Sequence, residues 1–175
     1  SLADARRFLA LCRQALAPEG VLRLTTPNLD WVHATQYRPA LWSGVEDAVA
    51  DCLRLNRLFY GWGHRFLYNR DTLAGLLREA GFATVEPCFR GESQHAELRG
   101  LERHELYEDS PELPHILILE AQGWLETTEP FEAKGFEEYR RDTEMPFHQL
   151  QYAALSAVRL VKRVLGWHRE RKDQI

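Results

Sequence analysis

The 175-residue sequence lacks the features that mark several common classes of protein. Its three cysteines, Cys12, Cys52 and Cys88, are widely spaced and form no C-x-x-C pair, which argues against a zinc knuckle and against a disulfide framework. No apolar run approaches the ~20 residues that span a bilayer, and no signal peptide is visible. From these absences we expect a protein of the reducing cytoplasm.

The phosphate-binding loops of nucleotide enzymes are also missing. Neither G-x-G-x-x-G nor G-x-x-x-x-G-K-[ST] occurs, and Gly61-Trp62-Gly63 has no strand before it. The net charge of -4 argues against a nucleic-acid partner. What is present, 45% hydrophobic and 27% charged residues, is typical of one globular domain. The sequence starts at Ser1 inside a helical pattern, from which we expect an upstream part to be missing.

Three segments have the composition of β-strands. Val21–Thr26 is rich in strand-forming residues and is closed by a proline. Residues 83–89 form a second candidate, in which Pro87 favours an edge position or a bulge. Ile116–Ala121 is nearly all apolar, which predicts a strand buried on both faces. Since helical patterns separate these segments, the sequence predicts an α/β fold.

Helical periodicity accounts for much of the chain before residue 60. A first helix covers residues 3–17, and a second of roughly four turns covers Val45–Phe59. Residues 31–44 show no clear periodicity and predict an irregular or short helical connection. The second helix is an insertion after a strand end, which either caps a ligand crevice or simply packs on the domain.

A third helix and a long polar loop follow. The helix covers residues 72–80, with Asn69 or Asp71 as its N-terminal cap and Gly81 at its C-terminal end. The polar segment 91–115 then separates the second and third strands. It is long for a connection of this kind, and long ordered loops tend to be functional.

The composition changes again after residue 123. Residues 124–146 are acidic and irregular and predict a linker or a loosely packed connection. Residues 147–175 predict a helix with one apolar and one basic face. Such a helix lies on an anionic membrane surface, binds a partner helix, or docks on its own sheet.

Polar residues gather where the first strand ends, at Thr25, Thr26, Asn28 and Asp30. In open α/β sheets, ligands bind at the carboxyl ends of the strands, so these residues are candidate ligand contacts. A simple turn is an equal alternative, because Pro-Asn is common turn chemistry.

The stretch from Trp62 to His104 is dense in aromatic, glycine, histidine and carboxylate residues. His64 is a candidate base or ligand contact, although such a ring is more often structural. The loop adds four polar candidates: Glu92, Ser93, Glu102 and His104. A metal set of Glu92, His95 and His104 matches no metal motif. A nucleophilic set of Ser93, His104 and Glu102 lacks a nucleophile elbow.

Three stretches share their order and spacing with one known family. The first runs from Phe8-Leu9 through Leu16-Ala17-Pro18-Glu19-Gly20 to Thr26-Pro27-Asn28. The second runs from His64 to Tyr68 and on through Thr72-Leu73 and Leu76-Leu77 to Ala80-Gly81-Phe82. The third comprises Gly91-Glu92-Ser93 and Leu98–His104. Over residues 3–121 the chain resembles the C-terminal half of a class I S-adenosylmethionine-dependent methyltransferase of the methyltransferase type 11 group, with Glu19 where that family usually has glycine.

The resemblance implies a partial Rossmann-like methyltransferase sheet of about three strands with flanking helices in residues 1–123. The acidic connection, 124–146, and the basic amphipathic helix, 147–175, would follow. The implied cofactor is S-adenosylmethionine. In this family a glycine-rich loop and an acidic residue hold this donor, and both precede the helix at residues 3–17. The chain is then a fragment, a truncated paralogue, or a partner of a separate N-terminal half.

On the same resemblance, the chain supplies the acceptor side of the site, for a small-molecule, lipid or saccharide acceptor. We expect His64 and Tyr68 to be catalytic, by positioning, with a base needed only where the acceptor must lose a proton. The expected substrate-binding residues are Asn28, Asp30, Glu92, Ser93, Glu102 and His104.

Two further expectations concern partners. A three-stranded sheet leaves the strand Val21–Thr26 at an open edge, which favours a homodimer through that strand. The alternative to an enzyme is a non-catalytic, truncated interaction module, in which the basic helix at 147–172 makes peripheral contact with a membrane or a partner.

Overall fold

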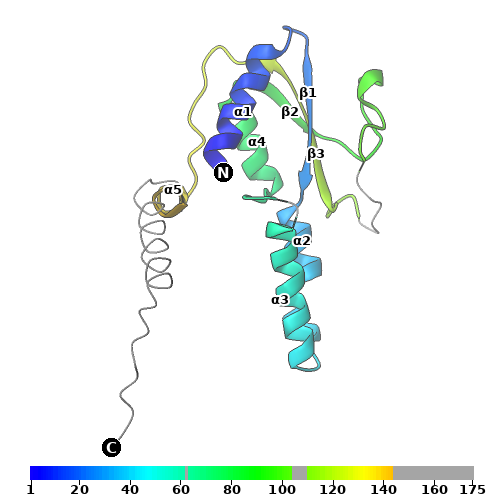
Figure 1. Ribbon diagram of the computed structural model, residues 1–175. Helices are drawn as coiled ribbons and strands as arrows, with labels where there is room; N and C mark the ends of the chain where they lie inside the picture. Colours follow the sequence, from blue (N-terminus) through cyan, green and yellow to red (C-terminus); the bar gives the residue numbers. More distant parts are fainter. Residues whose placement is uncertain (62, 104–109, 144–175) are drawn as a thin grey trace, which may run out of the picture. The chain divides into compact units, whose positions relative to one another are not determined.

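The computed structural model describes residues 1–61, 63–103 and 110–143 (Figure 1). The chain divides into two compact units, Ser1–Phe131 and Glu132–Ile175. The first unit contains the sheet and helices α1 to α4, and the described part of the second unit contains α5.

A three-stranded sheet forms the centre of the first unit. Its strands are β1 (Val21–Pro27), β2 (Phe82–Pro87) and β3 (Ile116–Trp124), in the spatial order β1-β3-β2. β3 runs antiparallel to both neighbours, so β1 and β2 are parallel to each other. The connection between them crosses from one edge of the sheet to the other and includes α4, which makes a split β-α-β unit. The fold is therefore mixed α/β, as the sequence predicts.

The burial of the strands follows their positions. All six residues of Ile116–Ala121 are buried, which confirms the prediction of a strand covered on both faces. β3 continues further than predicted, to Trp124, because Phe82 pairs with Trp124 and their rings lie 5.8 Å apart. Pro87 ends the edge strand β2, as its missing N–H requires.

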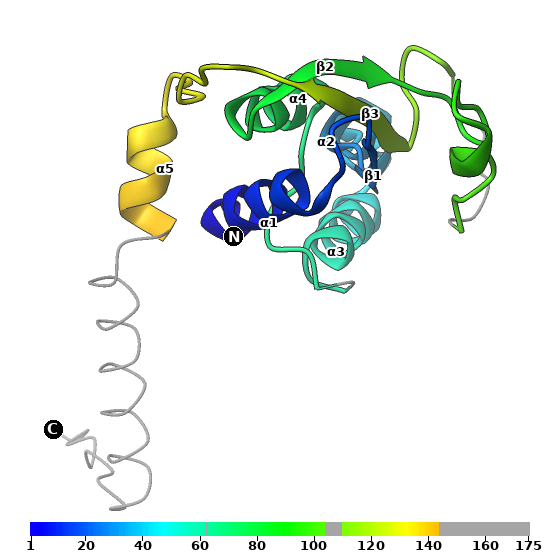
Figure 2. The same cartoon turned by 90° about the horizontal axis from the view of Figure 1, so that it is seen from above.

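Helices α1 (Leu2–Ala15) and α4 (Arg70–Glu79) pack together on one side of the sheet (Figure 2). α4 contacts β2 and β3 directly. The buried side chains of the two helices are Leu2, Leu9, Leu73, Leu76 and Leu77. This leucine layer and the apolar residues of β3 form the core of the unit.

Side-chain caps set where these helices begin. Ser1 and Asp4 form a capping box, so α1 starts one residue before the predicted range. The start of α4 is capped by Asn69, whose side-chain oxygen accepts a hydrogen bond from the Thr72 amide at 3.0 Å. Gly81 follows α4 with φ of 99°, a backbone conformation that glycine adopts without strain.

Between β1 and α4 lies a helical insertion, which agrees with the short helical alternative of the connection predicted over residues 31–44. It consists of α2 (Leu29–Gln36), a 3₁₀ turn at Pro39–Leu41, and α3 (Val45–Tyr60). α2 was not apparent from periodicity, because only Val32 of it is buried. α3 agrees with the predicted Val45–Phe59 to within one residue. α2 and α3 pack together and extend beyond the end of β1 (Figure 1).

Asp51 holds the parts of the insertion together through the hydrogen bonds of its carboxylate. This carboxylate is buried and accepts hydrogen bonds from the Arg38 amide at 2.7 Å and from Trp42 Nε1 at 2.9 Å. It also forms an ion pair with Arg54, one turn further along α3. Asp51 therefore ties the 3₁₀ turn to the packed side of α3, because a buried carboxylate must have its acceptor oxygens satisfied.

The acidic segment after residue 123 begins with a strand residue and is then held by hydrogen bonds of its backbone. Trp124 belongs to β3, the Leu125 amide donates to the Gly81 carbonyl at 3.0 Å, and Arg6 donates to the Phe131 carbonyl at 3.3 Å. These bonds hold residues 125–131 along the first unit. In the second unit, α5 covers Phe136–Thr143, with carboxylates in its first turn and arginines in its last, as the helix dipole favours.

The predicted basic helix at 147–175 lies outside the described residues. Within the described ranges, no helix is long and apolar enough to cross a bilayer.

Candidate functional site

Asn28 is the centre of the cluster at the carboxyl end of β1. Its side chain is only 3% exposed and has both polar groups engaged. The amide oxygen accepts from the Asp30 amide at 3.0 Å and caps α2, while the amide nitrogen donates to the Pro114 carbonyl at 2.8 Å. The Asn28 backbone amide donates to the His115 carbonyl at 3.0 Å. Asn28 thus joins β1, α2 and the approach to β3.

Tyr68 lies directly beside Asn28, although forty residues separate them in the sequence. The two residues form an isolated parallel bridge, and the Leu29 amide donates to the Tyr68 carbonyl at 2.9 Å. The Tyr68 ring is half-buried and lies 4.7 Å from the ring of Phe66, between centroids. Two of the predicted site residues therefore meet at the strand end for which the sequence predicts either a ligand site or a simple turn.

His64 and Asp30 lie near this cluster in the sequence, and among the described residues no hydrogen bond joins either side chain to it. His64 is half-buried in the loop between α3 and α4, and no described residue forms a hydrogen bond or ion pair with it. Asp30 is exposed in the first turn of α2, where its charge suits the helix dipole. Thr25 is exposed and Thr26 half-buried, one before the other on β1.

His115 is a member of the cluster that the sequence argument missed. It is buried immediately before β3, and its ring lies 6.0 Å from that of Trp31 in an edge-on arrangement. A cavity of about 230 Å³ adjoins it, lined in part by Phe89, Pro111 and Pro114. The carboxyl-end criterion that selected Asn28 does not select His115, which precedes the amino end of β3; the two residues meet because β3 runs antiparallel to β1.

Glu102 and Ser93 lie elsewhere, around Arg23 in the middle of β1. The Arg23 side chain is 4% exposed and contacts the carboxylates of Glu102, 1% exposed, and Glu120, 8% exposed. Its nitrogens lie 2.6 Å from Glu102 Oε1 and 2.5 Å from Glu120 Oε1. The second Glu102 oxygen accepts from the Gly91 amide at 2.9 Å. This Arg23 cluster fastens the loop of residues 88–103 to the sheet.

The charges in the Arg23 cluster stabilise one another. Burial alone would lower the pKa of Arg23, but the hydrogen bonds and charges of Glu102 and Glu120 raise it above its usual range. Burial would raise the pKa of Glu102, but the Gly91 amide and Arg23 outweigh it, so that this pKa falls. The pKa of Glu120 is lowered against burial by Ser93 and Arg23. All three groups are therefore ionised at neutral pH.

Burial, and then the charge of Glu120, raise the pKa of the neighbouring Cys88 thiol. Cys88 therefore holds its proton at neutral pH and is a poor nucleophile there.

The predicted substrate-binding set consequently divides in two. Asn28 follows Arg23 by five positions, about 16 Å along an extended strand. Glu102 is bound by Arg23 and by the Gly91 amide, and it fixes the loop to the sheet. Glu92 is exposed in the same loop, with its amide bonded to the Phe89 carbonyl at 3.1 Å.

The metal and nucleophile alternatives gain no support in the described part of the chain. No group of three or more metal-binding side chains occurs among the described residues. Ser93 Oγ accepts from the His95 amide at 2.9 Å, and Glu102 is committed to Arg23. His104, which both sets require, lies outside the described residues.

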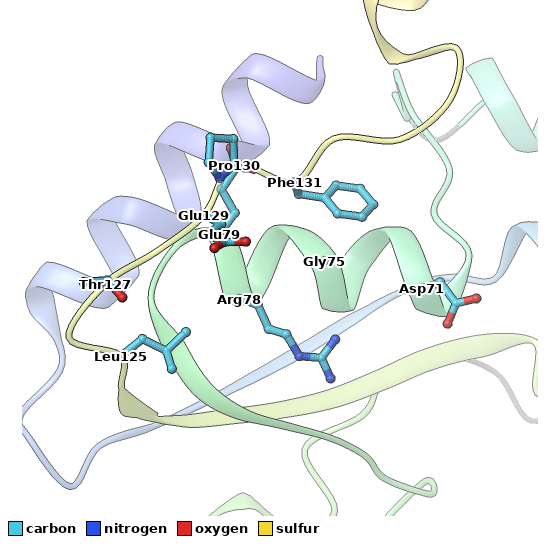
Figure 3. Close-up of a pocket in the computed structure, with 9 residues that line it drawn as sticks. All are labelled: Asp71, Gly75, Arg78, Glu79, Leu125, Thr127, Glu129, Pro130 and Phe131. Atoms are coloured by element: carbon cyan, nitrogen blue, oxygen red, sulfur yellow. The ribbon is translucent and has the colours of Figure 1, made fainter.

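A cavity of about 500 Å³ lies between α4 and the segment 125–131. Figure 3 shows Phe131 lying over α4 beside Gly75. The lining also includes the charged side chains of Asp71, Arg78 and Glu79. None of the described predicted site residues lines this cavity, so its size alone does not make it the candidate site.

A comparison of the chain with models of protein families finds no match, and comparisons with curated proteins and with solved structures also find none. The candidate site therefore rests on the sequence motifs and on the geometry at the end of β1.

Proposed function

We propose that this chain forms the acceptor-side part of an S-adenosylmethionine-dependent methyltransferase domain of the methyltransferase type 11 group. One observation carries the proposal. The segments Thr26-Pro27-Asn28 and His64–Tyr68, which carry the resemblance, meet through the Asn28–Tyr68 bridge. They meet at the carboxyl end of a strand, where α/β proteins bind ligands. The three-stranded sheet with crossover helix is consistent with a partial Rossmann-like sheet.

The donor, when bound, supplies an electrophilic methyl group on a sulfonium. The residues of this chain act on the acceptor. Tyr68 and His64 position it, and the cavity beside His115 accepts its less polar part, because Phe89, Pro111 and Pro114 line that cavity. Asn28 fixes the scaffold rather than the acceptor, since both its polar groups are already bonded. No glycine-rich loop follows a strand here, so no residue is assigned to the donor.

The test is calorimetric titration with S-adenosylmethionine. We expect no binding to this chain alone and micromolar binding once an upstream region containing the glycine-rich loop is joined to it. If the longer protein folds cooperatively and still does not bind the donor, the methyltransferase proposal is wrong.

A second experiment separates the roles within the cluster. In the longer protein, Tyr68→Phe and His64→Gln should lower kcat while leaving Tm within about 2 °C. Asn28→Ala should lower Tm, because it removes a helix cap and a buried hydrogen bond. His33→Gln, at an exposed histidine of α2, is the matched control and should change neither. Unchanged kcat in both site variants would remove Tyr68 and His64 from the proposal.

A further inference from the structure

The outer surface of α3 carries an apolar stripe that no described residue covers. At about 100° per residue, six residues fall within an arc of about 100° on this helix. They are the apolar Val45, Val49, Cys52, Leu53 and Tyr60 and the polar Asn56, and all six are exposed. Val45 is 79% and Leu53 66% exposed, unusually open for aliphatic side chains at helical spacing.

The stripe lies opposite the side of α3 that packs on the protein. Asp51, which is buried, and the half-buried Leu55 and Leu58 occupy that other side. A helix that is apolar on its outer face as well as its inner face has a second partner. Charged residues beside the stripe, Glu46 and Arg57, indicate what kind of partner fits it.

Glu46 and Arg57 lie on the same flank of the stripe, near opposite ends of α3. Both are exposed, and neither has an ion pair or hydrogen bond with its side chain among the described residues. They are eleven residues apart, about 16 Å along the helix, so they do not pair within one chain. In an antiparallel pair of identical helices, the same flanks face each other, and the acidic end of one meets the basic end of the other.

We propose that α3 is a homodimer interface, in which a second copy of this chain packs its own α3 antiparallel along the stripe. The two-fold axis passes between Cys52 and Leu53, at the midpoint of Val45–Tyr60. Val45 then packs against Tyr60 of the second copy. Glu46 lies within about 3 Å, measured along the axis, of Arg57 of the second copy. The proposal does not rest on the proposed function and uses a different surface from the open edge of β1.

Sedimentation of the full chain between 1 and 200 μM tests the association. We expect a dimer that dissociates on dilution, since one helix pair buries less than the ~1,600 Å² of a standard stable interface. Leu53→Glu should weaken the dimer at least about 100-fold, because the lost burial occurs in both copies. Leu11→Glu, on α1 with a similar exposure of 62%, is the matched control and should leave it unchanged.

Charge reversal tests the antiparallel register. Glu46→Arg and Arg57→Glu should each weaken the dimer, and the double variant should restore it, because each chain then offers the reversed pair to its copy. A bismaleimide of short span should link two chains through Cys52, and Cys52→Ser should abolish the link.

Three results would overturn the proposal. The first is a full chain that remains monomeric at 200 μM. The second is a dimer that persists in Leu53→Glu, which would place it on another surface. The third is Cys52 protected from a thiol reagent in the monomer, which would mean that residues of the same chain cover the stripe.

Discussion

Arg23 is buried on β1 with two carboxylates, and its contribution to stability depends on both. Removing a partner from a buried ion pair leaves an uncompensated charge, which costs about 3–5 kcal/mol. We expect Arg23→Met to lower the free energy of unfolding by about this amount, because Glu102 and Glu120 would remain buried without their cation. Urea unfolding measures the change.

Arg7→Met is the control for that measurement, because Arg7 pairs with Asp4 on the exposed surface of α1. It should change the unfolding midpoint little. Equal effects of the two substitutions would show that the Arg23 cluster contributes no more than a surface pair.

The same cluster predicts how stability depends on pH. The pKa values of Glu102 and Glu120 are lower in the folded protein than the ordinary value of 4.5. Their contribution is therefore complete above that value and is lost as the pH falls through the folded values. We expect Tm to fall steeply on acidification below about pH 4.5.

Glu102→Gln separates this effect from general acid unfolding. The variant should have a lower Tm at pH 7 but a shallower decline between pH 5 and pH 3, because one of the two titrating groups is gone. Glu97→Gln, at an exposed position of the same loop, should leave the slope unchanged. If Tm declined in parallel in the parent protein and in both variants, the loss of stability at low pH would be due to other carboxylates.

At the scale of elements, Gly75 and Phe131 decide how the segment 125–131 lies on α4. A Cβ atom at Gly75 would come within 2.4 Å of two ring atoms of Phe131. Glycine inside a helix otherwise costs about 1 kcal/mol relative to alanine. At position 75, packing against the Phe131 ring favours glycine, whereas helix propensity favours alanine.

We expect the effect of Gly75→Ala to change sign with its partner. In the parent protein it should destabilise, because Phe131 must leave its place. In a Phe131→Ala background it should stabilise by about 0.5–1 kcal/mol through helix propensity alone. A double-mutant cycle by thermal unfolding measures the coupling. The same effect in both backgrounds would mean that the Phe131 ring can move aside without a loss of stability.

Elements whose signals are local could be predicted from the sequence. The periodicity of α3 and the apolar run of β3 were sufficient to predict these two elements, because the pattern of apolar residues in each segment reflects which of its residues are buried. For α2 the sequence predicted only an irregular or short helical connection, because this helix has little apolar periodicity and its cap, Asn28, was interpreted as either a ligand contact or a turn residue. A cap and a turn use the same side-chain bond, so the sequence alone does not separate them.

The candidate site likewise has one part that the sequence predicted and one part that it did not. Asn28 and Tyr68 were assigned to one site by motif order, and the structure places them together. Glu102 was assigned to that site as one of the polar residues of the loop after Gly91, but its partner Arg23 is 79 positions away in the sequence. The missed signal was a charge pattern: Arg23 and Glu120 are the charged residues of two strands that are otherwise uncharged, and a buried charge needs a partner of opposite sign.

For the whole molecule, the two edges of the sheet differ. β2 ends in Pro87 and has exposed Thr84 and Glu86, features that discourage further pairing. β1 also ends in a proline, Pro27, but its Leu22 and Leu24 are only half-buried. The sheet is therefore suited to continue beyond β1, which agrees with the proposed methyltransferase domain.

Hydrogen exchange tests this asymmetry. In the chain alone, the amides of β1 that point away from β3 should exchange fast, while those of β3 exchange slowly, because only the latter lie between two strands. Joining the upstream region should slow the outward amides of β1 at least about 100-fold, through pairing with an added strand, and leave β2 unchanged. Protection at β2 would mean that the sheet grows at the other edge. If protection of β1 instead rises with the concentration of the chain alone, the strand pairs with a second copy, and Leu53→Glu would not abolish that protection.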